Sequence, residues 1–189
     1  MNFLIRGKGV ISSALRQKGI EDLITASTYI KHLPYKRNKF KEDILCILKE
    51  NCGTCSTKNL FVKALADENR FNDAELMVGI YRMNTSNTPK VRAVLEKYKL
   101  DYIPEAHCYI RYGNKVYDFT DTRPGVFLEE LIEEVELGVD SFHENKKAIH
   151  KKFLGDWRKK ENISYSNDEL WKIREECIAM LSLVPQTVY

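Results

Sequence analysis

A cysteine, a histidine and an aspartate are spaced in this sequence so that together they could activate a thiol. A thiol becomes an effective nucleophile only when it is ionised, and a helix N-terminus and a nearby imidazolium both favour the thiolate. Cys55 follows the glycine-containing loop 52–54, at the point where a helical apolar pattern begins that runs to about Asp67. We therefore expect Cys55 in the first turn of a helix, with Thr54 as its N-cap, or Ser56 if the helix begins later.

The histidine and the aspartate fall on the two arms of the clearest hairpin signal in the chain. Two runs rich in apolar and aromatic residues, together spanning about 106–120, flank the turn signal Gly113-Asn114. If these two residues form the turn, His107 and Asp118 become diagonal neighbours on one face of the sheet, within reach of each other. A loop one residue longer would bring Asp121 to that position instead.

Such a set of side chains suits nucleophilic attack on a carbonyl carbon. The aspartate holds one imidazole nitrogen and fixes the tautomer, and the other nitrogen then takes the proton of the thiol. Backbone N–H groups at the helix N-terminus, including that of Cys55, can hold the developing oxyanion. Gly53 lets the chain turn sharply and lets a substrate approach. Tyr109 shares the sheet face of His107, where it either lines the site or joins the core.

Taken in order, these segments resemble the transglutaminase-like branch of the papain-like cysteine enzymes. The run Cys52-Gly53-Thr54-Cys55-Ser56 resembles the nucleophile segment of papain-like proteases, in which the second cysteine reacts. The run His107-Cys108-Tyr109, eleven residues before Asp118-Phe119-Thr120, resembles the transglutaminase core, in which a histidine followed by an aromatic residue precedes an aspartate on the next strand. The resemblance covers about residues 50–121.

The resemblance implies a role for each of the three residues. Cys55 would be the nucleophile, His107 the general base and acid, and Asp118 the orienting acid. Asn51 is the nearest upstream amide for an oxyanion contact, because no glutamine stands just before the cysteine. The candidates for contacts with the oxyanion or the substrate are therefore Asn51, Gly53, Thr54 and Tyr109.

We accordingly expect an α+β, papain-like fold of the transglutaminase-core type. The helix that carries the cysteine would pack on a small antiparallel sheet, with extra helices at the C-terminus. Residues 1–189 would form one domain, with an α+β core over about 1–121 and a helical extension over about 122–189 packed on it. The expected activity is acyl transfer or hydrolysis on a small-molecule or peptide amide or ester, with no metal and no cofactor.

Alternative interpretations use the same cysteines differently. Cys55 can be an inert, buried helix residue of a binding module that keeps the fold without turnover. Cys52 and Cys55 can also serve redox chemistry or bind a structural zinc ion with His107 and Cys108. The last two residues are adjacent on a strand and point to opposite faces, which argues against a shared metal ion.

Hydrophobic periodicity predicts further elements around this core. They are helices over 10–33, 40–50, 126–137, 142–161 and 167–183, a strand over 76–83 and a helix that begins at Pro89. Ser141 with Glu144 fits the capping-box spacing at the start of the helix over 142–161. Ser166 with Glu169 fits the same spacing at the start of the next helix.

One loop is strongly basic, with the sequence Lys36-Arg37-Asn38-Lys39-Phe40-Lys41. It could hold an anionic substrate or a nucleic-acid backbone, or it could be an ordinary charged surface connection. The overall net charge of +3 is too mild to indicate a nucleic-acid binder.

Composition indicates a folded protein that works in a reducing compartment. Hydrophobic residues make up 43% of the 189 residues and charged residues 30%, which excludes global disorder. The five cysteines are too few and odd in number for a disulfide scaffold, so we expect reduced thiols. No signal peptide, membrane-spanning stretch or glycine-rich phosphate loop is visible, and we expect a cytoplasmic protein without a membrane partner. The sequence leaves the oligomeric state open.

Overall fold

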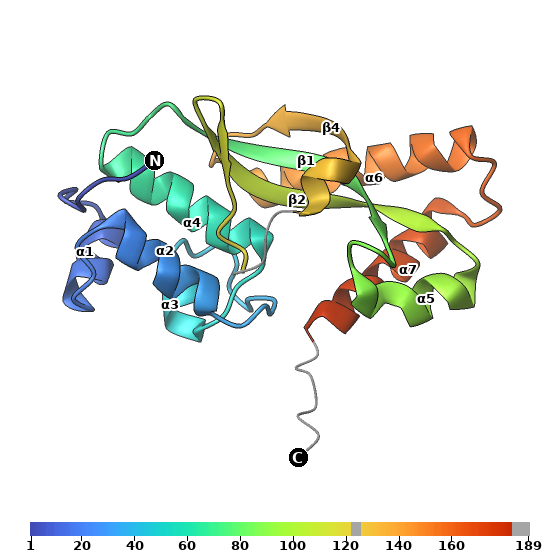
Figure 1. The fold of residues 1–189 in the computed structure, drawn as a ribbon, viewed down its shortest axis with the longest axis horizontal. Helices are drawn as coiled ribbons and strands as arrows, with labels where there is room; N and C mark the ends of the chain where they lie inside the picture. The colour runs from blue at the N-terminus through green and yellow to red at the C-terminus, as the bar shows by residue number, and fades with distance from the viewer. Residues whose placement is uncertain (122–125, 183–189) are drawn as a thin grey trace, which may run out of the picture. The chain divides into compact units, whose positions relative to one another are not determined.

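The computed structural model has an α+β architecture, and it describes residues 1–121 and 126–182. Within these residues four strands form a small sheet in the order β3-β2-β1-β4 (Figure 1). The pair β2 and β3 is antiparallel. The predicted α+β class with a small antiparallel sheet is thereby confirmed.

The elements have these bounds. The α-helices are α1 (Val10–Gln17), α2 (Leu23–His32), α3 (Cys46–Glu50), α4 (Cys55–Glu68), α5 (Arg92–Tyr98), α6 (Phe142–Lys160) and α7 (Asn167–Leu181). The strands are β1 (Ala74–Asn84), β2 (Tyr102–Tyr112), β3 (Lys115–Tyr117) and β4 (Leu131–Glu136). Two short 3-10 helices are η1 (Pro89–Val91) and η2 (Val126–Glu130).

The described residues group into two compact units. The first contains Met1–Val78, residues 107–121 and Val135–His143; the second contains Gly79–Ala106, Val126–Glu134 and residues 144–182. Strands β1 and β2 contribute residues to both units. Segment 79–106 therefore groups with the C-terminal helices.

Helix α4 is fixed within the first unit by burial and by a charged contact with α1. Phe61 and Leu65 of α4 are completely buried. At the other end of the helix, the Glu68 carboxylate accepts the backbone N–H groups of Ile11 (3.0 Å) and Ser12 (2.7 Å). These amides lie in the first turn of α1, where a negative charge also suits the helix dipole. The helix that begins at the candidate nucleophile is thus held along its length.

Residues 10–33, predicted as mostly helical, form two helices. Helix α1 ends before Gly19, which adopts a positive φ of 74°, a conformation that ends helices and favours glycine. Helix α2 begins after Asp22, whose carboxylate accepts the Thr25 N–H at 2.9 Å. An N-cap of this kind starts a new helix at a defined residue.

The helix predicted over 40–50 is formed only at its end, as α3. The Asp43 carboxylate accepts the backbone N–H of Leu45 at 2.9 Å, and Lys49 pairs with the same carboxylate. A side chain that bonds the backbone two residues ahead stabilises a turn in place of a helix. The apolar spacing was therefore a correct sign of burial for Ile47 and Leu48 but not for Phe40, which is exposed, and it was an incorrect sign of helix length.

The acidic helix predicted over 126–137 is wrong. These residues form the short helix η2 and then strand β4, which lies beside β1 in the sheet. Just beyond the strand, the backbone N–H of Leu137 donates to Leu76 O at 2.9 Å. Pairing with the edge of β1 satisfies backbone groups that would otherwise be exposed, and this tertiary gain overrides the helical pattern.

The two C-terminal helices are confirmed, as α6 and α7, although residue 183 lies outside the described residues. The Ser166 capping box is present, because the N–H of Ser166 donates to Glu169 at 2.7 Å and the N–H of Glu169 donates to the Ser166 hydroxyl. The capping box predicted at Ser141 is not formed in this way, since Ser141 has a φ of 53° and not the extended backbone of an N-cap. No described helix is long and apolar enough to cross a membrane.

The second unit joins α7 and α6 to the first half of β2. Arg174 of α7 donates from two guanidinium nitrogens to the buried Glu105 carboxylate, at 2.6 and 2.5 Å. Trp157 of α6 donates from its indole nitrogen to the Tyr102 hydroxyl at 2.8 Å. The two-point contact between Arg174 and Glu105 offsets the cost of burying both charges.

Candidate active site

Cys55 is the first residue of α4, as predicted, and 5% of its surface is exposed. Thr54 precedes it in the extended conformation of an N-cap. The backbone N–H of Thr54 donates to the Thr57 hydroxyl at 3.0 Å, and that hydroxyl donates to Asn38 Oδ1 at 2.8 Å. The Asn38 amide nitrogen in turn donates to Cys52 O at 3.0 Å. The loop before the thiol is therefore fixed on both sides by hydrogen bonds.

Gly53 has a structural role in this loop. Its N–H donates to Pro34 O at 3.1 Å, and its carbonyl accepts the N–H of Lys36 at 3.2 Å. A Cβ at this position would lie only 2.9 Å from the Lys58 side chain and 3.0 Å from that of Ile47. Only glycine fits so closely, and because its amide is already bonded, the prediction that Gly53 contacts an oxyanion has no support here.

The predicted hairpin register is confirmed. Tyr112 pairs with Lys115 across Gly113-Asn114. This register brings His107 and Asp118 together, and His107 Nε2 donates to Asp118 Oδ2 at 2.8 Å. Asp118, and not the reserve candidate Asp121, is thus the carboxylate that bonds the His107 ring.

The Asp118 carboxylate is itself held from the other side. Its Oδ1 accepts the backbone N–H of Thr120 at 2.9 Å and the Thr120 hydroxyl at 2.5 Å. Burial by itself would raise the pKa of Asp118, but His107 and the two Thr120 donors outweigh burial and hold that pKa below its usual range. The carboxylate is therefore ionised and fixed in direction.

The surroundings of His107 favour its protonated form. Burial lowers the pKa of its ring, but the Asp118 carboxylate and the hydrogen-bonded Cys55 side chain outweigh burial and raise the pKa to about 10. Since Nε2 faces Asp118, Nδ1 is the ring nitrogen left for the sulfur. The ring and the carboxylate are 15% and 18% exposed. The arrangement suits a thiolate and imidazolium pair at neutral pH.

Asn59 joins the three segments of the site, and sequence reasoning did not identify it. This completely buried side chain donates from Nδ2 to Cys55 O and to Cys108 O, both at 3.0 Å. Its Oδ1 accepts the N–H of Phe119 at 3.2 Å, next to Asp118. Asn59 thus connects the start of α4, strand β2 and the segment after β3.

Lys58 is a second buried residue that sequence reasoning missed. Its Nζ donates to Leu33 O and Thr120 O, each at 2.6 Å. Burial lowers the pKa of Lys58 to about 8, although Asp121 and Asp118 favour its charged form. A signal was available, because Lys58 and Asn59 stand three and four residues after the cysteine and so share its face of the helix.

The other predicted contact residues have structural positions. Asn51 is exposed and follows α3 in a left-handed conformation with a φ of 51°, as its C-cap. Tyr109 is completely buried in the core and not at the surface of the site. Of the two possibilities weighed for Tyr109, the core position is the one observed.

The alternative interpretations of the cysteines find little support. Within the described residues no group of three or more His, Cys, Asp or Glu side chains could hold a metal ion. Cys52 and Cys55 form no disulfide. Cys108 is completely buried, and its Sγ lies 3.6 Å from the Ser56 hydroxyl oxygen.

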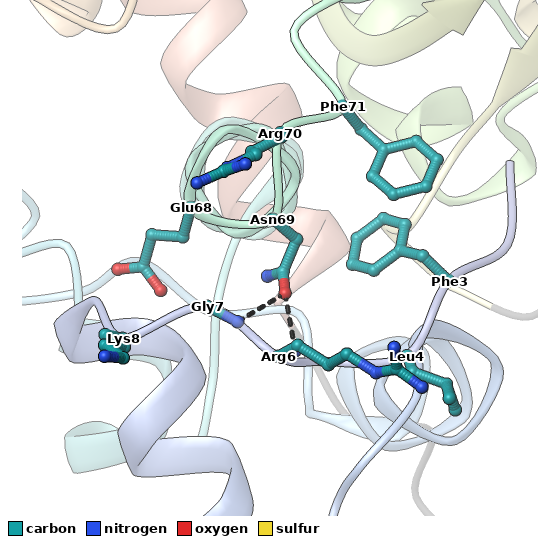
Figure 2. A pocket seen from close by; sticks show the side chains of 9 residues that line it. All are labelled: Phe3, Leu4, Arg6, Gly7, Lys8, Glu68, Asn69, Arg70 and Phe71. Atoms are coloured by element: carbon teal, nitrogen blue, oxygen red, sulfur yellow. Dashed lines mark hydrogen bonds between the residues drawn. The ribbon is translucent and has the colours of Figure 1, made fainter.

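A separate open pocket of about 810 Å³ lies at the far end of α4. Figure 2 shows Asn69 accepting the backbone N–H groups of Arg6 and Gly7, with Phe3 and Phe71 side by side. Because α4 has 14 residues, this end of the helix is about 20 Å from Cys55. The pocket does not contain the thiol or its partners, so it does not define the reactive site.

Comparisons with family models, curated proteins and solved structures find no match to this chain.

Replacing Asn59 with alanine should lower the free energy of unfolding by about 1–3 kcal/mol, because buried carbonyl groups lose their donor. The measurement is urea unfolding followed by circular dichroism. Asn145→Ala is the matched control, since Asn145 is exposed on α6, and it should leave the midpoint unchanged. Equal midpoints for both variants would show that the Asn59 contacts do not hold the site together.

The ring of His107 should stay protonated well above neutral pH. NMR titration of the imidazole nitrogens should give a midpoint near the pKa of about 10. Asp118→Asn should move the midpoint down, because the largest favourable charge is then lost. A wild-type midpoint near the ordinary histidine value of about 6.5 would contradict the pairing.

Proposed function

We propose that this chain is a cysteine-dependent enzyme that transfers or hydrolyses the acyl group of a small-molecule or peptide amide or ester. The observation that carries the proposal is the hydrogen-bonded set in which Asp118 holds His107 at 2.8 Å and His107 bonds Cys55. The thiol opens helix α4, where backbone N–H groups and the helix dipole favour negative charge. Nucleophile, base and orienting acid are the roles that such a set supports.

We also propose that the fold is papain-like, of the transglutaminase-core type. Support comes from the order of the parts along the chain. A helix that begins with the cysteine precedes a hairpin whose first strand carries the histidine and whose second arm ends at the aspartate. The C-terminal helices α6 and α7 would then be an addition to this core.

In the first step the Cys55 thiolate attacks the carbonyl carbon of the substrate and a carbon–sulfur bond forms. The carbonyl oxygen becomes an oxyanion, which the N–H groups of the first turn of α4 stabilise. The oxyanion then collapses and the bond to the leaving amine or alcohol breaks. The His107 imidazolium gives its proton to the leaving group, and a thioester remains on the enzyme.

In the second step water or an amine resolves the thioester. Neutral His107 takes a proton from this nucleophile as it attacks, and the carbon–sulfur bond breaks to release the thiolate. His107 is then again an imidazolium beside a thiolate, as at the start. Asp118 stays ionised throughout and holds the ring in position.

Three of the other four thiols support selective reactivity at Cys55. Burial, together with neighbouring carboxylates, raises the pKa of Cys46 to about 11 and that of Cys177 to about 12. Burial also raises the pKa of Cys52. These three cysteines are therefore protonated at neutral pH and poorly nucleophilic.

Alkylation with iodoacetamide near pH 6 should modify Cys55 fastest. The thiolate is the reactive form of a cysteine, and Cys55 is the cysteine that the proposed ion pair keeps as a thiolate at this pH. Mass spectrometry of peptides gives the rate at each cysteine. His107→Ala should slow modification of Cys55 by about tenfold or more, since the imidazolium that stabilises the thiolate is lost. Cys52→Ser, the matched control two residues before Thr54, should leave the rate at Cys55 unchanged. An ordinary thiol titration at Cys55 would sink the catalytic proposal.

Incubation with 4-nitrophenyl acetate should release one equivalent of nitrophenolate in a burst and leave an acetyl group on Cys55. Intact-mass analysis with and without added amine would separate hydrolysis from transfer. Cys55→Ser should abolish the burst, and Cys52→Ser should retain it. If Cys55 is reactive toward iodoacetamide but no acyl-enzyme forms, the chain is better described as a binding module that keeps the site without turnover.

A further inference from the structure

Lys58 brings a completely buried positive charge into the first turns of helix α4. Its Nζ donates to Leu33 O and to Thr120 O, each at 2.6 Å, and both of these acceptors are neutral. Burying an ammonium in this way is costly, because two carbonyl groups replace its shell of water. A neutral amide could donate to two carbonyls at a lower cost, which points to a use for the charge itself.

One of the two acceptors leads directly to the carboxylate of the candidate site. Thr120, whose carbonyl accepts the Lys58 ammonium, donates its backbone N–H at 2.9 Å and its hydroxyl at 2.5 Å to Asp118 Oδ1. The other oxygen of Asp118 is bonded to His107 Nε2 at 2.8 Å. A continuous series of contacts therefore connects the buried ammonium, through Thr120 and Asp118, to the imidazole ring.

The second acceptor connects the same ammonium to the loop before the thiol. Leu33 is the C-cap residue of α2, and the carbonyl of the next residue, Pro34, accepts the N–H of Gly53 at 3.1 Å. The Lys58 side chain also passes close to this loop, since a Cβ at Gly53 would lie 2.9 Å from Lys58 Cγ. Lys58 thus supports both the loop that leads to the nucleophile and the residue that holds the acid.

The charge of Lys58 is coupled to the charges of the site. Burial lowers the pKa of Lys58 most strongly, and four groups raise it, namely Asp121, Asp118, Cys52 and Cys55. Burial also raises the pKa of Cys52, so Cys55 is the thiol whose thiolate this charge can stabilise at neutral pH. Cys55 stands three residues before Lys58, on the same face of the helix. Coupling between two sites is reciprocal, so an ammonium favoured by the thiolate favours the thiolate in return.

We infer that Lys58 is a positioning residue for the proposed reaction. Through Thr120 its ammonium fixes the direction in which Asp118 faces His107, and its charge favours the ionised forms of Asp118 and Cys55. Lys58 has no contact with the substrate in this scheme and acts through the acid and the thiolate. The inference rests on the proposed function, and it adds a fourth residue to the set that maintains the thiolate and imidazolium pair.

The test measures the rate of the iodoacetamide reaction at Cys55 as a function of pH, in the full chain and in the variants Lys58→Met and Lys58→Arg. Methionine fills most of the same space without a charge or a donor, whereas arginine keeps both. In Lys58→Met the midpoint of the profile should rise by about one pH unit, which is a rate about tenfold lower on the acidic side. Lys58→Arg should recover part of this loss, and equal midpoints in the two variants would count against a role for the charge.

Lys63→Met is the matched control, because it makes the same change further along α4, where Lys63 pairs with Asp67. Its midpoint should equal that of wild type. Each variant is first checked for native circular dichroism, since a merely structural role of Lys58 would lower the stability without moving the midpoint of the folded protein. A midpoint in folded Lys58→Met equal to that of wild type would overturn the inference.

A second measurement leaves Lys58 in place and so does not depend on the folding of Lys58→Met. NMR of isotope-labelled lysine would follow the titration of the Lys58 ammonium in wild type and in Cys55→Ser. Serine removes the thiolate, so the Lys58 midpoint should fall by about half a pH unit or more. Cys177→Ser is the control, because Cys177 lies on α7 and its pKa of about 12 keeps it protonated.

The outcomes separate this inference from the proposed function. Fast iodoacetamide reaction of wild type near pH 6, with an unchanged profile in Lys58→Met, would overturn the role of Lys58 and leave the proposed function intact. Equal Lys58 midpoints in wild type and Cys55→Ser would do the same, and would decide the matter if Lys58→Met does not fold. Slow reaction of wild type near pH 6 would overturn both.

Discussion

The candidate site depends on one buried side-chain amide, that of Asn59. Its hydrogen bonds connect the carbonyl of Cys55, the carbonyl of Cys108 and the backbone N–H of Phe119. These groups belong to α4, to β2 and to the segment after β3, and α4 is far from the other two in the sequence. A buried carbonyl or N–H group without a partner costs about 1–3 kcal/mol, so one side chain fixes the relative positions of all three segments.

Around this amide, the buried charges of the site are compensated by nearby groups. The Lys58 ammonium rests on the carbonyls of Leu33 and Thr120. Asp118 receives His107 on one oxygen and the two Thr120 donors on the other. Charges held in this way do not need water to stabilise them, and their mutual interactions are stronger in the protein interior. The low dielectric constant of the interior makes these charges costly to bury, and it also strengthens the attraction that His107 would exert on a thiolate.

In the segment before the cysteine, some polar side chains bond to the backbone, whereas the basic side chains remain exposed. Asn38, Thr57 and Glu50 bond to backbone groups and define the path of the chain. Lys36 and its basic neighbours stay at the surface. An ordered backbone therefore carries exposed basic side chains.

The sequence by itself determined the features that depend on a few neighbouring residues. The turn at Gly113-Asn114 and the two-residue period of strands set His107 against Asp118, and the capping signal at Thr54 set Cys55 at a helix start. Only the tertiary structure decided features that depend on distant partners. It made residues 131–136 a strand, because β1 offered backbone groups to pair. It buried Lys58 and Asn59, because their hydrogen-bond partners come from segments that no local pattern can specify.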